Sequence, residues 1–135
     1  MDNIVIIAHN AKKPDMVKFL QEHIDWIPEV NLIATGYTAE FIEKEGIKVK
    51  HLSPGQTGGY LEIHQMLHNR EVDMVLFFMD PTVKKHHNDI ELLIDLCNTD
   101  NIPIATNPVS AELMILGLIR QRVAQRSKGI FKTED

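Results

Sequence analysis

Residues Met74-Val75-Leu76-Phe77-Phe78 form an uninterrupted apolar run, which ends in Met79-Asp80-Pro81. A second such run, Ile4-Val5-Ile6-Ile7-Ala8, leads directly into His9-Asn10. Continuous rather than alternating apolar residues are typical of strands that are covered on both faces, as in a parallel sheet between two layers of helices. Each run therefore predicts a buried strand with polar residues at its carboxyl end.

Three shorter apolar runs and five helix-like stretches alternate with these two strands. The shorter strands are expected at residues 32–34, 47–49 and 102–105, and the helices at residues 15–23, 38–44, 59–69, 88–97 and 110–118. Strands that alternate with helices imply parallel pairing through right-handed crossovers. The expected fold is a single three-layer α/β/α domain with a doubly wound, mainly parallel five-stranded sheet of the Rossmann-like kind.

Length, charge and cysteine content restrict the classes of protein and partner. The chain has 135 residues, of which 44% are apolar, so we expect one domain over residues 1–135, with residues 120–135 as a surface helix and a frayed end. Its net charge of −5 disfavours nonspecific nucleic-acid binding, which depends on neutralising phosphates. No run approaches the roughly 18 apolar residues of a membrane span. Cys97 has no partner for an internal disulfide, which makes a reducing cytoplasm the default compartment.

Small polar residues and glycines follow the second and third predicted strands. Thr35-Gly36-Tyr37-Thr38 enters a helix, where backbone N–H groups and two hydroxyls could face a phosphate. The stretch from Ser53 to Gly59 contains three glycines, which let the backbone approach a ligand closely. Each loop alone also fits turn glycines and helix caps, but the carboxyl ends of parallel strands share one edge. The sequence therefore predicts an anion site there, formed by Lys13, Thr35, Gly36, Tyr37, Thr38, Ser53 and Gly55.

Acid–base side chains are expected at the same edge, from His9, Asp80 and the cluster His86-His87-Asn88-Asp89. Imidazoles are suited to proton transfer near pH 7. An aspartate before a proline is also a common turn former, and Asp89 at a helix start also favours the helix dipole, so structural roles stay open for both. His64 and His68 have the spacing of metal ligands but no third ligand, so an exposed helix face is the simpler interpretation and no metal is expected.

Taken in chain order, these motifs resemble the methylglyoxal synthase family. The resemblance covers residues 4–118 and rests on Ile7-Ala8-His9-Asn10 with Lys13, Ala34-Thr35-Gly36 with Thr38, Ser53 with Gly58-Gly59, Phe77-Phe78-Met79-Asp80-Pro81, His86 with Asp89, and Ile102-Pro103-Ile104-Ala105-Thr106-Asn107. It implies a lyase that converts dihydroxyacetone phosphate to methylglyoxal and inorganic phosphate through an enediolate. It also implies no metal or organic cofactor, and assembly into homohexamers.

The resemblance also implies a role for each site residue. The anion-site residues would hold the substrate phosphate, and His9 and His86 would contact the carbonyl and hydroxyl oxygens and stabilise the enediolate charge. Asp80 and Asp89 would orient these groups or relay protons.

Tyr60 occupies the position at which the resemblance places the family's catalytic base, an aspartate. A phenol with an ordinary pKa of about 10 is ionised to roughly one part in a thousand at pH 7. Glu62 or Asp80 could serve instead, although two helical positions turn Glu62 away from the direction of Tyr60. Two functions therefore stay open: a lyase with an altered base, and a catalytically silent module that binds phosphate or a phosphorylated metabolite.

Overall fold

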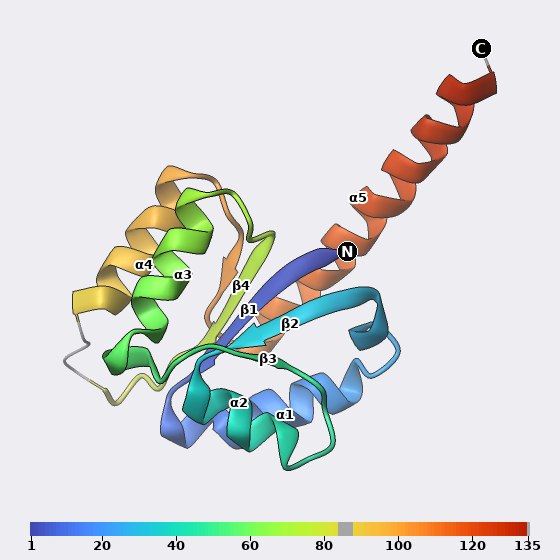
Figure 1. The fold of residues 1–135 in the computed structure, drawn as a ribbon. Coiled ribbons are helices and arrows are strands. Elements are labelled where there is room, and N and C mark those ends of the chain that lie inside the picture. Colours follow the sequence, from blue (N-terminus) through green and yellow to red (C-terminus); the bar gives the residue numbers. More distant parts are fainter. Residues whose placement is uncertain (84–87, 135) are drawn as a thin grey trace.

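The computed structural model describes residues 1–83 and 88–134 of the chain (Figure 1). Its sheet is formed by β1 (Asp2–Ala8), β2 (Val30–Ala34), β3 (Lys50–His51), β4 (Met74–Phe78) and β5 (Ile104–Ala105). The strand order is β3-β2-β1-β4-β5 and every neighbouring pair is parallel. The chain therefore builds the sheet from β1 to one edge, returns to the centre and builds the other half. This arrangement confirms the predicted doubly wound α/β fold.

Helices cover both faces of the sheet (Figure 1). One face carries α1 (Lys13–Glu22), α2 (Gly36–Glu43) and α5 (Pro108–Glu134), and the other carries α3 (Gly59–His68) and α4 (Asn88–Thr99). Three short 3-10 helices lie in the connections, at Asn10–Lys12, Ile27–Glu29 and Gly55–Thr57.

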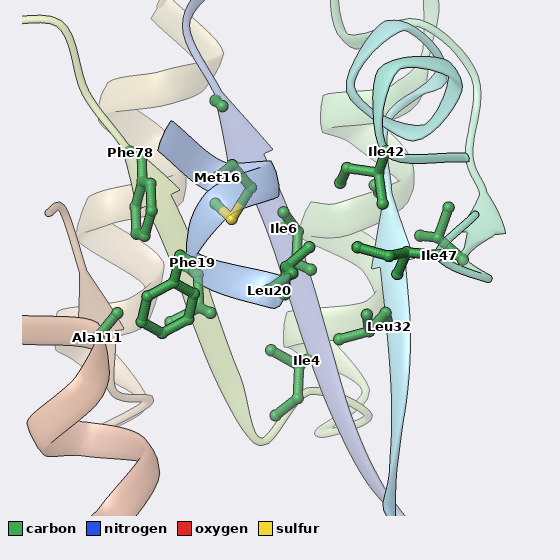
Figure 2. Packing of buried hydrophobic residues seen from close by; sticks show 14 of the residues in the cluster. Ile4, Ile6, Met16, Phe19, Leu20, Leu32, Ile42, Ile47, Phe78 and Ala111 are labelled. Carbon is green, nitrogen blue, oxygen red and sulfur yellow. The ribbon is translucent and has the colours of Figure 1, made fainter. Parts of the chain in front are cut away.

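The two faces of the sheet have separate hydrophobic cores, and β1 contributes to both. Ile4 and Ile6 pack with α1, α2 and α5, as Figure 2 shows, whereas Val5 and Ile7 pack with α3 and α4. All four side chains are buried. Because neighbouring side chains of a strand point to opposite faces, a strand covered on both sides needs a continuous apolar run. The prediction from the two apolar runs is confirmed for β1 and β4.

Several element starts differ from the predicted ones by two or three residues, including those of β3 and α2. Ile47 and Val49 are buried, but the ladder to β2 begins only where Ile33 pairs with Lys50, so β3 lies after the predicted residues 47–49. Helix α2 begins at Gly36 with Thr35 as its N-cap, two residues before the predicted start at Thr38.

The predicted helix 110–118 and the predicted surface helix at the C-terminus are one continuous helix, α5. Pro108 is its first residue, and Asn107 Oδ1 accepts the Ser110 N–H at 2.9 Å, so the cap precedes Ser110. All residues from 120 to 126 except Val123 are Arg, Gln or Ala, and these residues continue a helix readily even where the apolar pattern changes. Within the described ranges, no helix is both long and apolar enough to cross a membrane.

Candidate active site

A cleft opens at the carboxyl ends of β1 and β2, where loops distant in the sequence meet. Its volume is about 440 Å³, within the roughly 300–1,000 Å³ typical of small-molecule sites. Its lining consists of Ile7, Ala8, His9, Asn10, Lys13, Thr35, Tyr37, Thr38, Pro54, Gly55, Thr57, Tyr60, Val83 and Ile90. The structure therefore brings together seven residues predicted for the site: His9, Lys13, Thr35, Tyr37, Thr38, Gly55 and Tyr60.

A larger hollow of about 780 Å³ lies at the opposite end of β1 and β2. Its lining is mostly apolar, with Met1, Ile27, Pro28 and Met66 among its residues, and contains no histidine, serine, threonine or tyrosine. Ligands of doubly wound sheets bind at the carboxyl ends of the strands. Chemistry and topology therefore both favour the smaller cleft.

The His9 ring is held by the strand next to its own. Its Nδ1 accepts the backbone N–H of Asp80 at 2.8 Å, and the His9 amide donates to the Phe78 carbonyl at 3.1 Å. Because an amide only donates, Nδ1 is the unprotonated nitrogen, and the neutral ring carries its proton on Nε2. An Nε2–H of fixed orientation is suited to stabilise an oxygen on which negative charge develops.

This assignment predicts opposite tautomers for two histidines of the chain. His23 Nδ1 lies 2.8 Å from the Phe19 carbonyl, which only accepts, so His23 should carry its proton on Nδ1. Long-range ¹H–¹⁵N correlation spectra above pH 7 should show the Nε2–H form for His9 and the Nδ1–H form for His23, with each signal assigned by its loss in the glutamine variant. The Nδ1–H form at His9 would contradict the assignment for His9.

Lys13 supplies the positive charge of the cleft. It is the first residue of α1, and its Nζ donates to Asn10 Oδ1. Burial lowers the pKa of the Lys13 amine from its ordinary value, because the charged form loses water. Since the Asn10 amide is neutral, the contact orients the ammonium without cancelling its charge. An anion in the cleft would therefore meet a positioned and partly desolvated cation.

The first turn of α2 supplies hydrogen-bond donors beside Lys13. Thr35 and Thr38 are buried, and Thr35 makes no side-chain cap bond to the helix. Among the described residues, the amides of Tyr37 and Thr38 have no hydrogen-bond acceptor. Free N–H groups at a helix start attract anions, so this turn retains two of the donors that a phosphate needs.

Two other predicted donors are occupied inside the protein. The Gly36 amide donates to the Ser53 carbonyl at 3.2 Å, and the Ser53 amide donates to Glu62 Oε2 at 3.3 Å. Neither Gly36 nor Ser53 lines the cleft. These two residues join α2 to the glycine loop, which comprises residues 53–59.

The glycine loop is packed so closely that side chains are excluded from it. A Cβ on Gly59 would lie 2.1 Å from the Ser53 carbonyl oxygen, and a Cβ on Gly55 would lie 2.6 Å from Cζ of the Tyr60 ring. The ring of Tyr60 therefore rests against the backbone of Gly55 and reaches the cleft from the start of α3.

The Tyr60 phenol is kept protonated by its surroundings. Burial raises its pKa above the ordinary value of 10, and the negative charge of Asp89 raises it further. The hydroxyl is therefore a hydrogen-bond donor at neutral pH and a poor base.

The carboxylates at this edge differ in what they contact. The Oδ1 atom of Asp80 accepts hydrogen bonds from the backbone N–H of Thr82 at 2.9 Å and from the Thr82 hydroxyl at 2.7 Å. These hydrogen bonds lower the pKa of the Asp80 carboxyl. Its side chain thus forms the turn after β4, while its backbone N–H positions His9. Asp89 lies in the first turn of α4, where its charge acts on the phenol of Tyr60. Neither carboxylate is part of the lining of the cleft.

Two predictions about histidines have different outcomes. His64 is buried, and its Nε2 donates to the Asp89 carbonyl at 3.0 Å, so the predicted exposed face for His64 and His68 is wrong for His64. The reason is that α3 packs against α4 along this face. Within the described residues no group of three His, Cys, Asp or Glu side chains is arranged to hold a metal. His86, predicted as a catalytic residue, lies outside the described residues.

Residues 15–106 match the family described as the MGS-like domain. The chain belongs to the MGS-like domain family. Its curated relatives carry the name methylglyoxal synthase: the protein of Geobacillus sp. (strain WCH70) is 41% identical over 92% of this chain and 90% of its own length. That of Thermoanaerobacterium thermosaccharolyticum is 40% identical over 86% of this chain and 88% of its own.

A solved structure supports the same assignment. The crystal structure of methylglyoxal synthase from Elizabethkingia anophelis NUHP1 superposes with a TM-score of 0.78 at 36% identity, covering 84% of this chain and 76% of that one. The MGS-like match ends at residue 106, so α5 lies beyond it.

Sequence reasoning missed two residues that organise this MGS-like site. Asn10 orients Lys13, and the sequence feature that could have indicated this contact is the position of Asn10 three residues before the lysine. His64 joins α3 to the start of α4 by a hydrogen bond to the backbone carbonyl of Asp89. The spacing of residues along the chain does not indicate a contact of this kind between two helices.

Proposed function

We propose that this MGS-like chain is a lyase of the methylglyoxal synthase type, which converts dihydroxyacetone phosphate to methylglyoxal and inorganic phosphate. The observation that carries the proposal is the cleft, in which an anion cradle, His9 and the Tyr60 phenol face one volume of about 440 Å³. The names of the relatives support the same activity.

The phosphate would lie at the start of α2. Lys13 Nζ supplies the countercharge, and the amides of Tyr37 and Thr38 with the hydroxyls of Thr35 and Thr38 supply donors. Binding at this end places the three-carbon part of the substrate toward His9 and Tyr60.

The reaction begins with removal of a proton from the carbon that bears the hydroxyl, which gives an enediolate. The Nε2–H of His9 and the hydroxyl of Tyr60 donate to its oxygens as negative charge develops. The C–O bond to phosphate then breaks, and the resulting enol gains a proton to become methylglyoxal. The products together contain all the atoms of the substrate.

We assign proton removal to Asp89. Its charge acts on the phenol of Tyr60, and Tyr60 lines the cleft. The carboxylates of Glu62 and Asp80 hold the glycine loop and the turn after β4. Tyr60 itself is unsuitable, because its pKa is raised.

Replacing Lys13 by alanine should weaken the binding of inorganic phosphate by about 10- to 100-fold, as expected for losing one charged hydrogen bond of roughly 1.5–3 kcal/mol. Lys12→Ala is the matched control, because Lys12 pairs with Asp15 at 3.6 Å and does not line the cleft. Calorimetric titration with phosphate measures both. Equal losses in the two variants would place the anion elsewhere.

One observation favours the second function, a silent binding module: the phenol of Tyr60 stands where the family resemblance places a carboxylate. Incubation with dihydroxyacetone phosphate decides between the two functions. The lyase should release methylglyoxal and phosphate in equal amounts. Phosphate binding that depends on Lys13, together with turnover no faster than the buffer blank, would assign the chain to the binding module.

A further inference from the structure

One buried polar side chain lies outside the cleft. Thr35, Thr38 and His64 are the buried polar side chains of the described residues, and both threonines line the cleft whereas His64 does not. Burial of a polar group costs free energy unless the group is hydrogen-bonded. An apolar residue would avoid this cost at position 64, where the neighbouring Ile63 and Leu67 of α3 belong to the core. We therefore looked for the role of His64 in its contacts.

The hydrogen-bond partner of His64 is the residue to which proton removal is assigned. The His64 Nε2 donates to the backbone carbonyl of Asp89 at 3.0 Å, and Asp89 lies in the first turn of α4. A backbone carbonyl has two lone pairs, so this bond adds to the one that the carbonyl can accept within its own helix. The contact therefore orients the start of α4 relative to α3 without disrupting either helix.

The side chain of Asp89 acts on the same helix. Tyr60 and His64 are four residues apart on α3, which places them on one face of the helix. The charge of Asp89 acts on the Tyr60 phenol, while its backbone carbonyl accepts the His64 N–H. One face of α3 thus interacts with both the backbone and the side chain of Asp89.

Apolar packing alone fixes the relative position of α3 and α4 less strictly than a hydrogen bond does. Ile63, Leu67, Ile90 and Leu93 of these two helices belong to one core. Apolar attraction is non-directional, whereas a hydrogen bond requires a distance of about 3 Å and a limited range of angles. The bond from His64 therefore restricts a shift of the first turn of α4 along α3.

We propose that His64 is a positioning residue, which holds Asp89 in place relative to Tyr60. His64 does not line the cleft, so it acts through Asp89 and not on the substrate. Its effect on turnover rests on the proposed function, because Asp89 is the base of that reaction. Its effect on Tyr60 does not, and can be measured without substrate.

The titration of Tyr60 is the first test. The chain has two tyrosines, so in a Tyr37→Phe background the near-ultraviolet absorbance of tyrosinate reports the pKa of Tyr60 alone. His64→Leu should lower the pKa of Tyr60 toward its ordinary value, because the charge of Asp89 that raises it would no longer be held in place. A purely local effect of the apolar leucine would raise this pKa further, by increased desolvation.

Two variants serve as controls for the titration. His64→Gln should leave the pKa of Tyr60 unchanged, since the glutamine amide can donate in place of the imidazole Nε2. His68→Leu makes the same substitution at an exposed histidine one turn further along α3 and should also have no effect. Far-ultraviolet circular dichroism at each pH checks that the variants stay folded.

A double-substitution cycle tests whether His64 acts through Asp89. Asp89→Asn removes the charge and keeps the backbone carbonyl that accepts from His64. His64→Leu should lower the pKa of Tyr60 in the unmodified background and have no further effect when added to Asp89→Asn. A pKa of Tyr60 that His64→Leu does not lower would overturn the proposal. An equal fall in the Asp89→Asn background would also overturn it.

Turnover of dihydroxyacetone phosphate gives the second test. His64→Leu should lower kcat by about 10- to 100-fold, since a displacement near 1 Å can cost roughly a hundredfold, and should leave the affinity for inorganic phosphate within about twofold. His64→Gln should restore most of kcat. Equal losses of kcat in the two variants would contradict a positioning role. If the unmodified protein shows no turnover, the lyase proposal fails, and the titration of Tyr60 by itself decides the role of His64.

Discussion

Asp89→Asn is expected to lower the turnover of dihydroxyacetone phosphate by about 10²- to 10⁴-fold, the usual contribution of a positioned base. Asparagine keeps the size of the side chain and cannot accept the proton. The affinity for inorganic phosphate should stay within about twofold, because the anion cradle lies on α1 and α2. Steady-state rates from methylglyoxal release and a phosphate titration of the same preparation test both parts.

Tyr60→Phe is expected to lower turnover by only about tenfold or less, since it removes one neutral hydrogen-bond donor. Were the phenol itself the base, this variant would be inactive, and the wild-type rate would keep rising with pH beyond 10, because burial and Asp89 raise the pKa of Tyr60.

Glu62→Gln and Asp80→Asn serve as comparisons for the base. Their carboxylates contact the Ser53 amide and Thr82, so both variants should lose less activity than Asp89→Asn. If either comparison variant lost as much turnover as Asp89→Asn, the assignment of the base to Asp89 would be wrong.

Gly59→Ala is expected to destabilise the domain by about 1–3 kcal/mol and to weaken phosphate binding. The added Cβ would lie 2.1 Å from the Ser53 carbonyl oxygen, so the glycine loop must shift away from α3. Ser53 also accepts the Gly36 N–H, which transmits the shift to the start of α2. A displacement of about 1 Å in a positioned site can cost roughly a hundredfold in rate.

Gly117→Ala is the matched control for this substitution. Gly117 lies within α5, and beyond the backbone of its own helix the added Cβ would meet open space, so alanine should raise stability by about 0.5–1 kcal/mol through its better helix propensity. Urea denaturation compares the two variants. Equal stability changes, or a Gly59→Ala protein with unaltered phosphate affinity, would contradict the close packing of the loop.

The fold followed from local patterns, because burial on both faces of a strand imposes a continuous apolar run. Ile4 to Ala8 and Met74 to Phe78 are strands for this reason, and their alternation with helices fixes the parallel topology. Shorter elements were placed less accurately: the residues of β3 that pair with Ile33 and Ala34 are Lys50 and His51, and the buried apolar residues Ile47 and Val49 precede them.

The composition of the candidate site was also largely evident from the sequence. Loops that follow parallel strands meet at one edge whatever their distance in the chain, so the order of residue types alone grouped His9, Lys13, Thr35, Thr38 and Gly55. Seven of the predicted residues line one cleft.

The roles of these groups were decided only by the tertiary structure. Contacts with other segments of the chain decide three of these roles. They determine whether the Ser53 amide faces a ligand or Glu62, and whether Asp80 acts through its carboxylate or its backbone. They also determine which nitrogen of His9 carries the proton. A side chain's hydrogen bonds depend on distances of about 3 Å and on orientation, and residue type and spacing specify neither. The order of residue types along the chain therefore determined which groups lie together at the edge of the sheet. Three-dimensional packing determined which hydrogen bonds each group makes and thus the role it can have.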